Sequence, residues 1–128
     1  MVFPKISIMK RTLVLGASPN PSRYSHKATL LLSKKGHPVF PVGLREGNIG
    51  LHKILTKNPT IENIDTVTLY LGSHNQPKYY DYIIYSIAPK RIIFNPGTEN
   101  PELENLAQQA NMEVEIACTL VLLSIGNY

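Results

Sequence analysis

The chain has 128 residues, 43% of them hydrophobic and 17% charged, which fits one domain with a core and excludes a disordered tail or a membrane-spanning protein. A single cysteine, Cys118, excludes an internal disulfide framework and a zinc site of the CxxC type. The formal net charge is +4, but residues 1–57 hold ten Lys and Arg against one acid, and this basic half favours a polyanionic partner, either nucleic acid or a small ligand with several phosphates.

The chain begins with two predicted strands on either side of a helix. Thr12–Leu15 is an apolar run that ends at Gly16 and predicts a buried strand. Four apolar residues then recur at helical spacing and define the core face of a first helix: Tyr24, Ala28, Leu31 and Leu32. Gly36 follows the last turn as a C-terminal cap. Pro38–Val42 is the second predicted strand.

The middle of the chain predicts an irregular segment, two strands and a helix. Arg45–Asn63 is irregular, with one short strand near Lys53–Leu55. Strands are expected at Thr66–Leu71 and Arg91–Phe94. Between them, Pro77 suits the first turn of a helix whose core face has four members: Tyr80, Ile83, Ile84 and Ile87.

The last third predicts a helix, a strand and a short terminal helix. Asn100 and Pro101 form a helix start, and the core face of that helix is expected at Leu103, Leu106, Ala107 and Ala110. Glu113–Ala117 is a strand and Cys118–Ile125 a helix, which packs either internally or against a second copy. Strands and helices alternate throughout, so we expect an α/β domain with a mostly parallel sheet and helices on both faces.

In such a sheet a ligand binds beyond the carboxyl ends of the strands. The loop after the first strand, Gly16–Ser25, has one Gly for a tight turn. Near the helix start it offers the backbone amides of Ala17 and Ser18 and the hydroxyls of Ser18, Ser22 and Ser25. Arg23 adds a guanidinium suited to phosphate oxygens. The loop therefore predicts a phosphate site, although a Ser alone is also an ordinary helix cap and Arg23 an ordinary surface charge.

The same loop is neither a dinucleotide fingerprint nor a Walker loop. GxGxxG requires three glycines, and GxxxxGK[ST] does not occur. No acid directly follows the second strand, where Gly43-Leu44-Arg45 stands, so the carboxylate that binds an NAD ribose is missing from its expected place. Arg45 suits a phosphate on the adenosine ribose instead.

The run GASPNPSRYS, residues 16–25, resembles the GxSxxPxRxS loop of the small stand-alone bacterial CoA-binding domain proteins, which are related to the CoA-binding domain of the succinyl-CoA synthetase α subunit. The resemblance extends from Lys10 to the C-terminal helix and includes a late Cys118. It continues in three further segments: Gly36–Gly43, Ile64–Leu71 and Ile92–Gly97. One departure is Gly43-Leu44-Arg45, where the family has an Asn-Pro pair.

The resemblance implies a three-layer αβα, Rossmann-like domain with a doubly wound sheet of five or six strands over residues 10–128, after an N-terminal extension of residues 1–9. It implies coenzyme A or an acyl-CoA as the bound cofactor, with its diphosphate over the first loop, its adenine near the second strand's end and its pantetheine arm along the loops after Leu71 and Phe94. The loop Asn95–Asn100 is either a plain turn and helix cap or a ligand loop that presents backbone amides to this arm. The expected cofactor-binding residues are Gly16, Ala17, Ser18, Arg23, Ser25, Val42, Gly43, Leu71, Asn95, Pro96 and Gly97.

The sequence offers a site for binding and no evident site for chemistry. Cys118 is expected to be a structural buried thiol, and His26 and His74 surface residues. The four His show no metal-ligand spacing, and no acid/base pair of carboxylates is evident, so we expect neither a metal site nor catalysis. Two alternatives stay open: a nicotinamide-dependent or acyl-CoA-handling enzyme, and a nucleic-acid-binding regulatory adaptor. A cytoplasmic protein without a membrane segment is expected, with a homodimer or another protein partner possible.

Overall fold

The computed structural model describes residues 8–128, so most of the expected N-terminal extension lies outside the described part of the chain. Five parallel strands form one sheet in the order β2-β1-β5-β6-β7. Their bounds are Thr12–Leu15 (β1), Val39–Val42 (β2), Thr66–Leu69 (β5), Arg91–Phe94 (β6) and Glu113–Ile116 (β7). The predicted α/β, Rossmann-like fold is confirmed, with five strands in its sheet.

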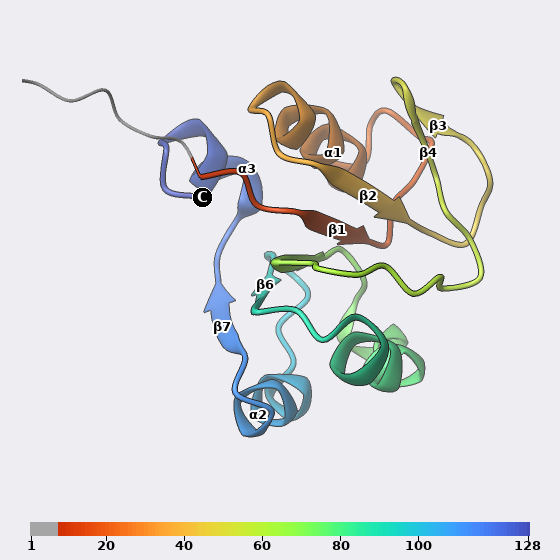
Figure 1. The fold of residues 1–128 in the computed structure, drawn as a ribbon. Coiled ribbons are helices and arrows are strands. Elements are labelled where there is room, and N and C mark those ends of the chain that lie inside the picture. Colours follow the sequence, from red (N-terminus) through yellow and green to blue (C-terminus); the bar gives the residue numbers. More distant parts are fainter. Residues whose placement is uncertain (1–7) are drawn as a thin grey trace, which may run out of the picture.

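Helices cover both faces of the sheet (Figure 1). One face carries α1 (Tyr24–Lys34) and α3 (Thr119–Ser124) over a core that includes Val14, Leu32 and Leu123. The other face carries α2 (Pro101–Gln109) and the helical segment η2–η3 (Pro77–Tyr79 and Tyr82–Ile87). The four residues of each of the three central strands are all buried, as expected for strands covered on both sides.

The segment that was expected to be one regular helix from Pro77 has a different geometry. Ser73–Asn75 (η1) and η2 are short 3₁₀ turns, and η3 is a π-helix that ends where Ala88 donates its N–H to the carbonyl of Ile83. The wider π turn brings Tyr82 into the core, and its hydroxyl donates to the carbonyl of Pro59 at 2.7 Å. Tyr80 and Ile84, expected on the core face, are therefore only half-buried.

Three other expected core positions are exposed. Tyr24 is the first residue of α1 and is 68% exposed, with the ammonium of Lys27 over its ring. Leu106 and Ala110 are exposed because α2 is short and presents only a narrow stripe, Leu103 and Ala107, to the sheet. The predicted cap of α2 is confirmed: the Asn100 side chain accepts from two backbone N–H groups of its first turn.

The irregular segment after β2 forms a small separate hairpin. Asn48–Ile49 (β3) pairs antiparallel with His52–Lys53 (β4), and Leu55 then pairs with Val42 at the sheet edge. The short strand expected near Lys53–Leu55 is instead β4, which begins one residue earlier and ends at Lys53. Among residues 8–128, no helix combines the length and apolar character needed to cross a membrane.

Candidate functional site

The loops after β1, β2 and β5 meet at the carboxyl edge of the sheet. Gly16 has φ +96°, and a Cβ atom there would lie 2.9 Å from the carbonyl oxygen of Tyr70. A Cβ atom at Gly43 would collide with the carbonyl oxygen of Ala17. Both contacts are with backbone, so glycine is required at both positions for the three loops to approach this closely.

The first two amides of the Gly16–Ser25 loop are used inside the protein. The N–H groups of Gly16 and Ala17 both donate to the carbonyl of Val42, at 3.0 and 2.9 Å. The expectation that the Ala17 amide is free for a phosphate is therefore wrong, because β2 already supplies its acceptor. These bonds fix the start of the loop to the neighbouring strand.

The middle of the loop is held by its own side chains. Asn20 accepts from the N–H and the hydroxyl of Ser22, at 3.0 and 2.8 Å, and donates its own N–H to the hydroxyl oxygen of Ser18 at 3.1 Å. The N–H of Arg23 donates to the carbonyl of Asn20. Asn side chains commonly close turns in this way, so the loop has a defined shape in the absence of a ligand.

Three N–H groups of this loop remain free. Within residues 8–128, no hydrogen bond takes the amide N–H of Ser18, Tyr24 or Ser25. Those of Tyr24 and Ser25 belong to the first turn of α1, an eleven-residue helix whose positive end attracts anions. Arg23 is exposed at the N-cap position and makes no ion pair within the described residues. Of the predicted residues, Ser18 is half-buried and Arg23 is exposed beside these donors, whereas Ser25 is only 3% exposed, so the expected Ser25 hydroxyl does not lie open to a ligand.

Two carbonyls of the loop, those of Ser18 and Ala17, lie against other parts of the protein. The oxygen of Ser18 lies 3.0 Å from Nδ1 of His26, whose side chain is only 8% exposed. The oxygen of Ala17 lies against Gly43. The expectation that His26 is a surface residue is wrong, because the ring turns under the loop from the first turn of α1. His74 is exposed, as expected.

A depression of about 410 Å³ opens beside Gly43, at the end of β2. Its volume is in the range of small-molecule sites. The residues that line it are Gly43, Leu44, Glu46, Thr56, Lys57, Asn58 and Tyr79. Lys57 and Asn58 both have left-handed backbone, with φ of 64° and 48°. The adenine subsite expected at Val42 and Gly43 is wrong for Val42, which is fully buried and does not line the depression. Sequence reasoning also missed residues 56–58, for which the Asn-Pro pair that follows Lys57 is the available turn signal.

In the loop after β6, the side chain of Asn95 makes hydrogen bonds within the protein. Asn95 is buried and donates to Thr68 Oγ1 (2.7 Å) and the Leu69 carbonyl (2.8 Å), while its Oδ1 accepts from the N–H of Thr119 (2.9 Å). These bonds tie β5, β6 and α3 together. The Asn95 side chain is therefore fully occupied, and the exposed residues of this loop are Pro96, Gly97 and Glu99.

The amide of Gly97 is likewise not free. It donates to both carboxylate oxygens of Glu99, at 2.9 and 3.0 Å. This bond and one from the N–H of Glu99 itself lower the pKa of that carboxyl. The expectation that this loop offers backbone amides to a ligand is thus wrong for Gly97, because a carboxylate of the same loop binds its N–H.

The groups with potential for chemistry belong to separate loops. Cys118 is half-buried at the N-cap of α3, after β7, and His74 follows β5, with β6 between the two strands. Tyr70, directly after β5, has a buried hydroxyl without a hydrogen-bond partner within the described residues. Burial raises the pKa of Tyr70 to about 12, so its phenol stays protonated at neutral pH.

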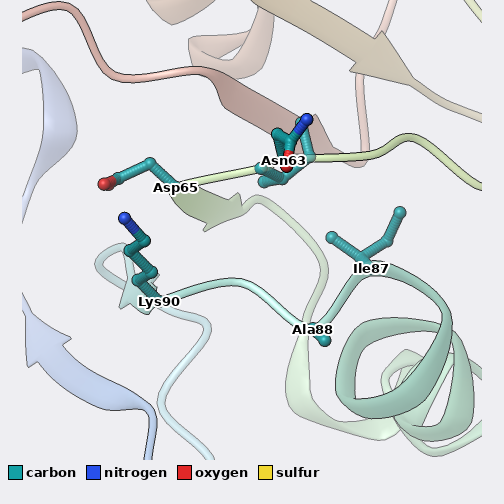
Figure 2. Close-up of a pocket in the computed structure, with 6 residues that line it drawn as sticks. Asn63, Asp65, Ile87, Ala88 and Lys90 are labelled. Carbon is teal, nitrogen blue, oxygen red and sulfur yellow. The ribbon is translucent and has the colours of Figure 1, made fainter.

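A second depression, of about 290 Å³, lies at the opposite edge of the sheet. Figure 2 shows the side chains of Asp65 and Lys90 pointing toward each other there, beside Asn63, Ile87 and Ala88. The amino ends of parallel strands are not where α/β sheets bind their ligands. We therefore place the candidate site at the carboxyl edge, around the Gly16–Ser25 loop and Gly43.

Comparisons with known proteins agree on the fold. The family model described as CoA binding domain matches residues 10–124. A crystallised protein described as uncharacterized is 47% identical, with 95% of this chain and 100% of that chain covered and a TM-score of 0.91. A hypothetical protein from Pyrococcus horikoshii OT3 is 25% identical, with 88% and 80% covered and a TM-score of 0.77. A protein from Thermus thermophilus is 21% identical, with 93% and 91% covered and a TM-score of 0.78. No curated protein matches the chain.

Proposed function

Because this chain belongs to the CoA-binding domain family, we propose that it binds coenzyme A or an acyl-CoA through the Gly16–Ser25 loop. The observation that carries the proposal is a set of donors without a partner among residues 8–128: the N–H groups of Ser18, Tyr24 and Ser25, beside the guanidinium of Arg23. Amides at a helix start and a planar guanidinium together suit the oxygens of a diphosphate.

The adenosine end of the ligand belongs, in this proposal, to the depression beside Gly43. Lys57 lines this depression and supplies a cation for the 3′-phosphate on the ribose of coenzyme A. The residues directly after β2, Gly43-Leu44-Arg45, include no acid for the two free hydroxyls of an NAD ribose. Glu46 also lines the depression, so the preference for a ribose that carries phosphate rests on the charge of Lys57.

The pantetheine arm extends, in this proposal, across the loops after β5 and β6. Leu71 is half-buried and its side chain packs close to Gly16, so it offers an apolar wall next to the diphosphate loop. Gly97 has φ +88° and open space around its Cα, which leaves room beside the loop after β6. Contacts here are apolar or to carbonyls, because the Gly97 amide is already bound to Glu99.

We propose that the domain binds its ligand without catalysing a reaction. His74 and Cys118 are the two side chains best suited to acid/base or nucleophilic catalysis. They follow different strands, β5 and β7, and β6 lies between those strands. Incubation with an acyl-CoA, or with NADPH and a panel of carbonyl compounds, should give no turnover. Steady consumption of either cofactor would instead favour the enzyme hypothesis.

Thermal unfolding and calorimetry with pure ligands test the binding proposal. Coenzyme A at a hundred times its Kd adds about 2.7 kcal/mol to the free energy of unfolding, so it should raise the Tm clearly. Dephospho-CoA, which lacks the 3′-phosphate, should raise it less. A Tm that is unchanged in millimolar coenzyme A contradicts the proposal, and salt-dependent binding of an oligonucleotide instead would favour the adaptor hypothesis.

A further inference from the structure

We propose that His26 is a positioning residue, which holds the Gly16–Ser25 loop with its donors outward and its Ser18 carbonyl inward. The proposal rests on the diphosphate site proposed above and adds to it the side chain that maintains its shape. His26 is the third residue of α1 and is 8% exposed. Its Nδ1 lies 3.0 Å from the carbonyl oxygen of Ser18.

The hydrogen-bond partner of Nδ1 determines which ring nitrogen of His26 carries the hydrogen. A carbonyl oxygen only accepts hydrogen bonds, so Nδ1 of His26 carries the hydrogen. In the neutral ring this is the Nδ1–H tautomer, in which Nε2 has no hydrogen. The bond joins residues eight positions apart and so links the loop after β1 to the body of α1.

The orientation of the Ser18 carbonyl matters because the next residue is Pro19. Proline has no N–H, so the peptide group between these residues offers an acceptor and no donor. If this peptide rotated outward, it would present the negative end of a carbonyl dipole to a bound diphosphate. His26 holds that oxygen on the inner side of the loop.

The other contacts of the Gly16–Ser25 loop do not hold the Ser18 carbonyl in this orientation. The bonds between Ser18, Asn20 and Ser22 are local and close the turn without reaching Ser18's carbonyl. The neighbouring Ala17 carbonyl lies against the backbone of Gly43, a contact that does not involve the Ser18 oxygen. Among the described residues, the side chain that binds the Ser18 carbonyl is that of His26.

Two amide substitutions at His26 distinguish the effect of the hydrogen bond from Nδ1 to the Ser18 carbonyl from the effect of the ring's volume. In His26→Asn, the side-chain amide can put an N–H where Nδ1 stands, whereas in His26→Gln the amide lies one bond further out, near the position of Nε2. We expect the Asn variant to bind coenzyme A within about twofold of the unmodified protein. The Gln variant should bind about tenfold more weakly, the scale of one lost hydrogen bond to a buried acceptor.

Nuclear magnetic resonance on the protein without ligand gives the second measurement. The ¹⁵N shifts of the unmodified His26 ring should show a protonated Nδ1, and the Ser18 amide resonance should move in the Gln variant more than in the Asn variant. Equal affinities of the folded Gln variant and the unmodified protein would overturn the proposal. So would an Nε2–H tautomer at His26, a result that needs no variant to fold.

These readouts also separate this proposal from the binding proposal on which it rests. If the unmodified protein binds no coenzyme A, the proposed function fails, while the His26 tautomer and the Ser18 resonance still report whether the loop is held as described. If coenzyme A binds and both variants bind it as the unmodified protein does, the positioning role alone fails.

Discussion

The carbonyl oxygen of Ala17 lies so close to Gly43 that no side chain can stand at position 43 without moving a backbone segment. This contact joins the loop after β1 to the loop after β2. The N–H groups of Gly16 and Ala17, both bound to the Val42 carbonyl, join the same two loops from the other side. The proposed diphosphate loop is therefore built on the end of β2 as much as on its own helix.

Substitution of Gly43 by Ala should lower both stability and ligand affinity. The added Cβ must displace the Ala17 carbonyl, and overpacking of this kind costs about 1–3 kcal/mol. Thermal unfolding and coenzyme A titration of Gly43→Ala measure the two effects. Gly72→Ala is the control, because Gly72 has φ −60° and its Cβ would meet only the ring of the exposed His74. Equal losses in the two variants would show that the Ala17–Gly43 contact has no special role.

Substitution of Arg23 by Ala should weaken coenzyme A binding and leave the fold intact. The guanidinium is exposed and makes no ion pair within residues 8–128, so its removal breaks no internal contact. The loss of a charge-assisted hydrogen bond predicts about 1–3 kcal/mol less binding free energy by calorimetry. Lys34→Ala, in the last turn of the same helix, should change the affinity little. An unchanged Kd for Arg23→Ala would make Arg23 an ordinary surface charge.

Lys57→Gln tests the assignment of the 3′-phosphate. The substitution removes the charge from the depression beside Gly43 and keeps a long side chain at a left-handed position. We expect the affinity for coenzyme A to fall by several-fold and the affinity for dephospho-CoA to stay nearly constant, since that ligand lacks the phosphate. Lys53→Gln, on the neighbouring hairpin, is the matched control. If both ligands lose affinity equally, Lys57 does not recognise the 3′-phosphate.

His37 predicts a pH dependence of stability that is independent of the ligand. Its Nδ1 accepts the N–H of Lys10 at 2.9 Å, so the folded protein holds this ring without a proton on Nδ1. Burial, and then the charges of Lys10 and Arg91, lower its pKa from 6.5. The unfolded chain binds a proton at His37 more readily, so the contribution of this residue to stability is present above pH 6.5 and is lost as the pH falls toward its lowered pKa.

His37→Asn removes this titration and keeps an acceptor for the Lys10 amide. The free energy of unfolding, measured by denaturant between pH 5 and 8, should fall less steeply with acid in the variant than in the unmodified protein. Identical slopes would show that His37 does not contribute to the acid sensitivity of the fold.

The α/β fold was predictable because β1, β2 and β6 are short, mostly apolar runs bounded by turn residues. β1 and β6 begin and end where their sequence patterns do. The geometry of the segment after Pro77 was not predictable, because an α-helical spacing of apolar residues does not reveal a π turn. The buried Tyr82 also bonds to the carbonyl of Pro59, which is distant in sequence. Tertiary contacts of this kind leave no local signal.

The candidate site likewise has features that were predictable from the sequence and features that were not. The place of Ser18, Arg23 and Ser25 near the start of α1 was predictable from the loop motif, since a helix start is a local feature. The occupied amides of Ala17 and Gly97 were not, because their acceptors, the Val42 carbonyl and the Glu99 carboxylate, follow from how the loops fold. Lys57 was missed because the Asn-Pro pair after it signals a turn but does not reveal that this turn lies beside Gly43.

The most direct test is a ¹⁵N–¹H nuclear magnetic resonance titration of the protein with coenzyme A, followed at the individual backbone amides. If the Gly16–Ser25 loop binds the diphosphate, the amides of Ser18, Tyr24 and Ser25 should show the largest shifts and saturate together, while the Gly97 amide, bound to Glu99, shifts less. Saturable binding that leaves those three amides unmoved, or no shift anywhere at millimolar coenzyme A, would contradict the account.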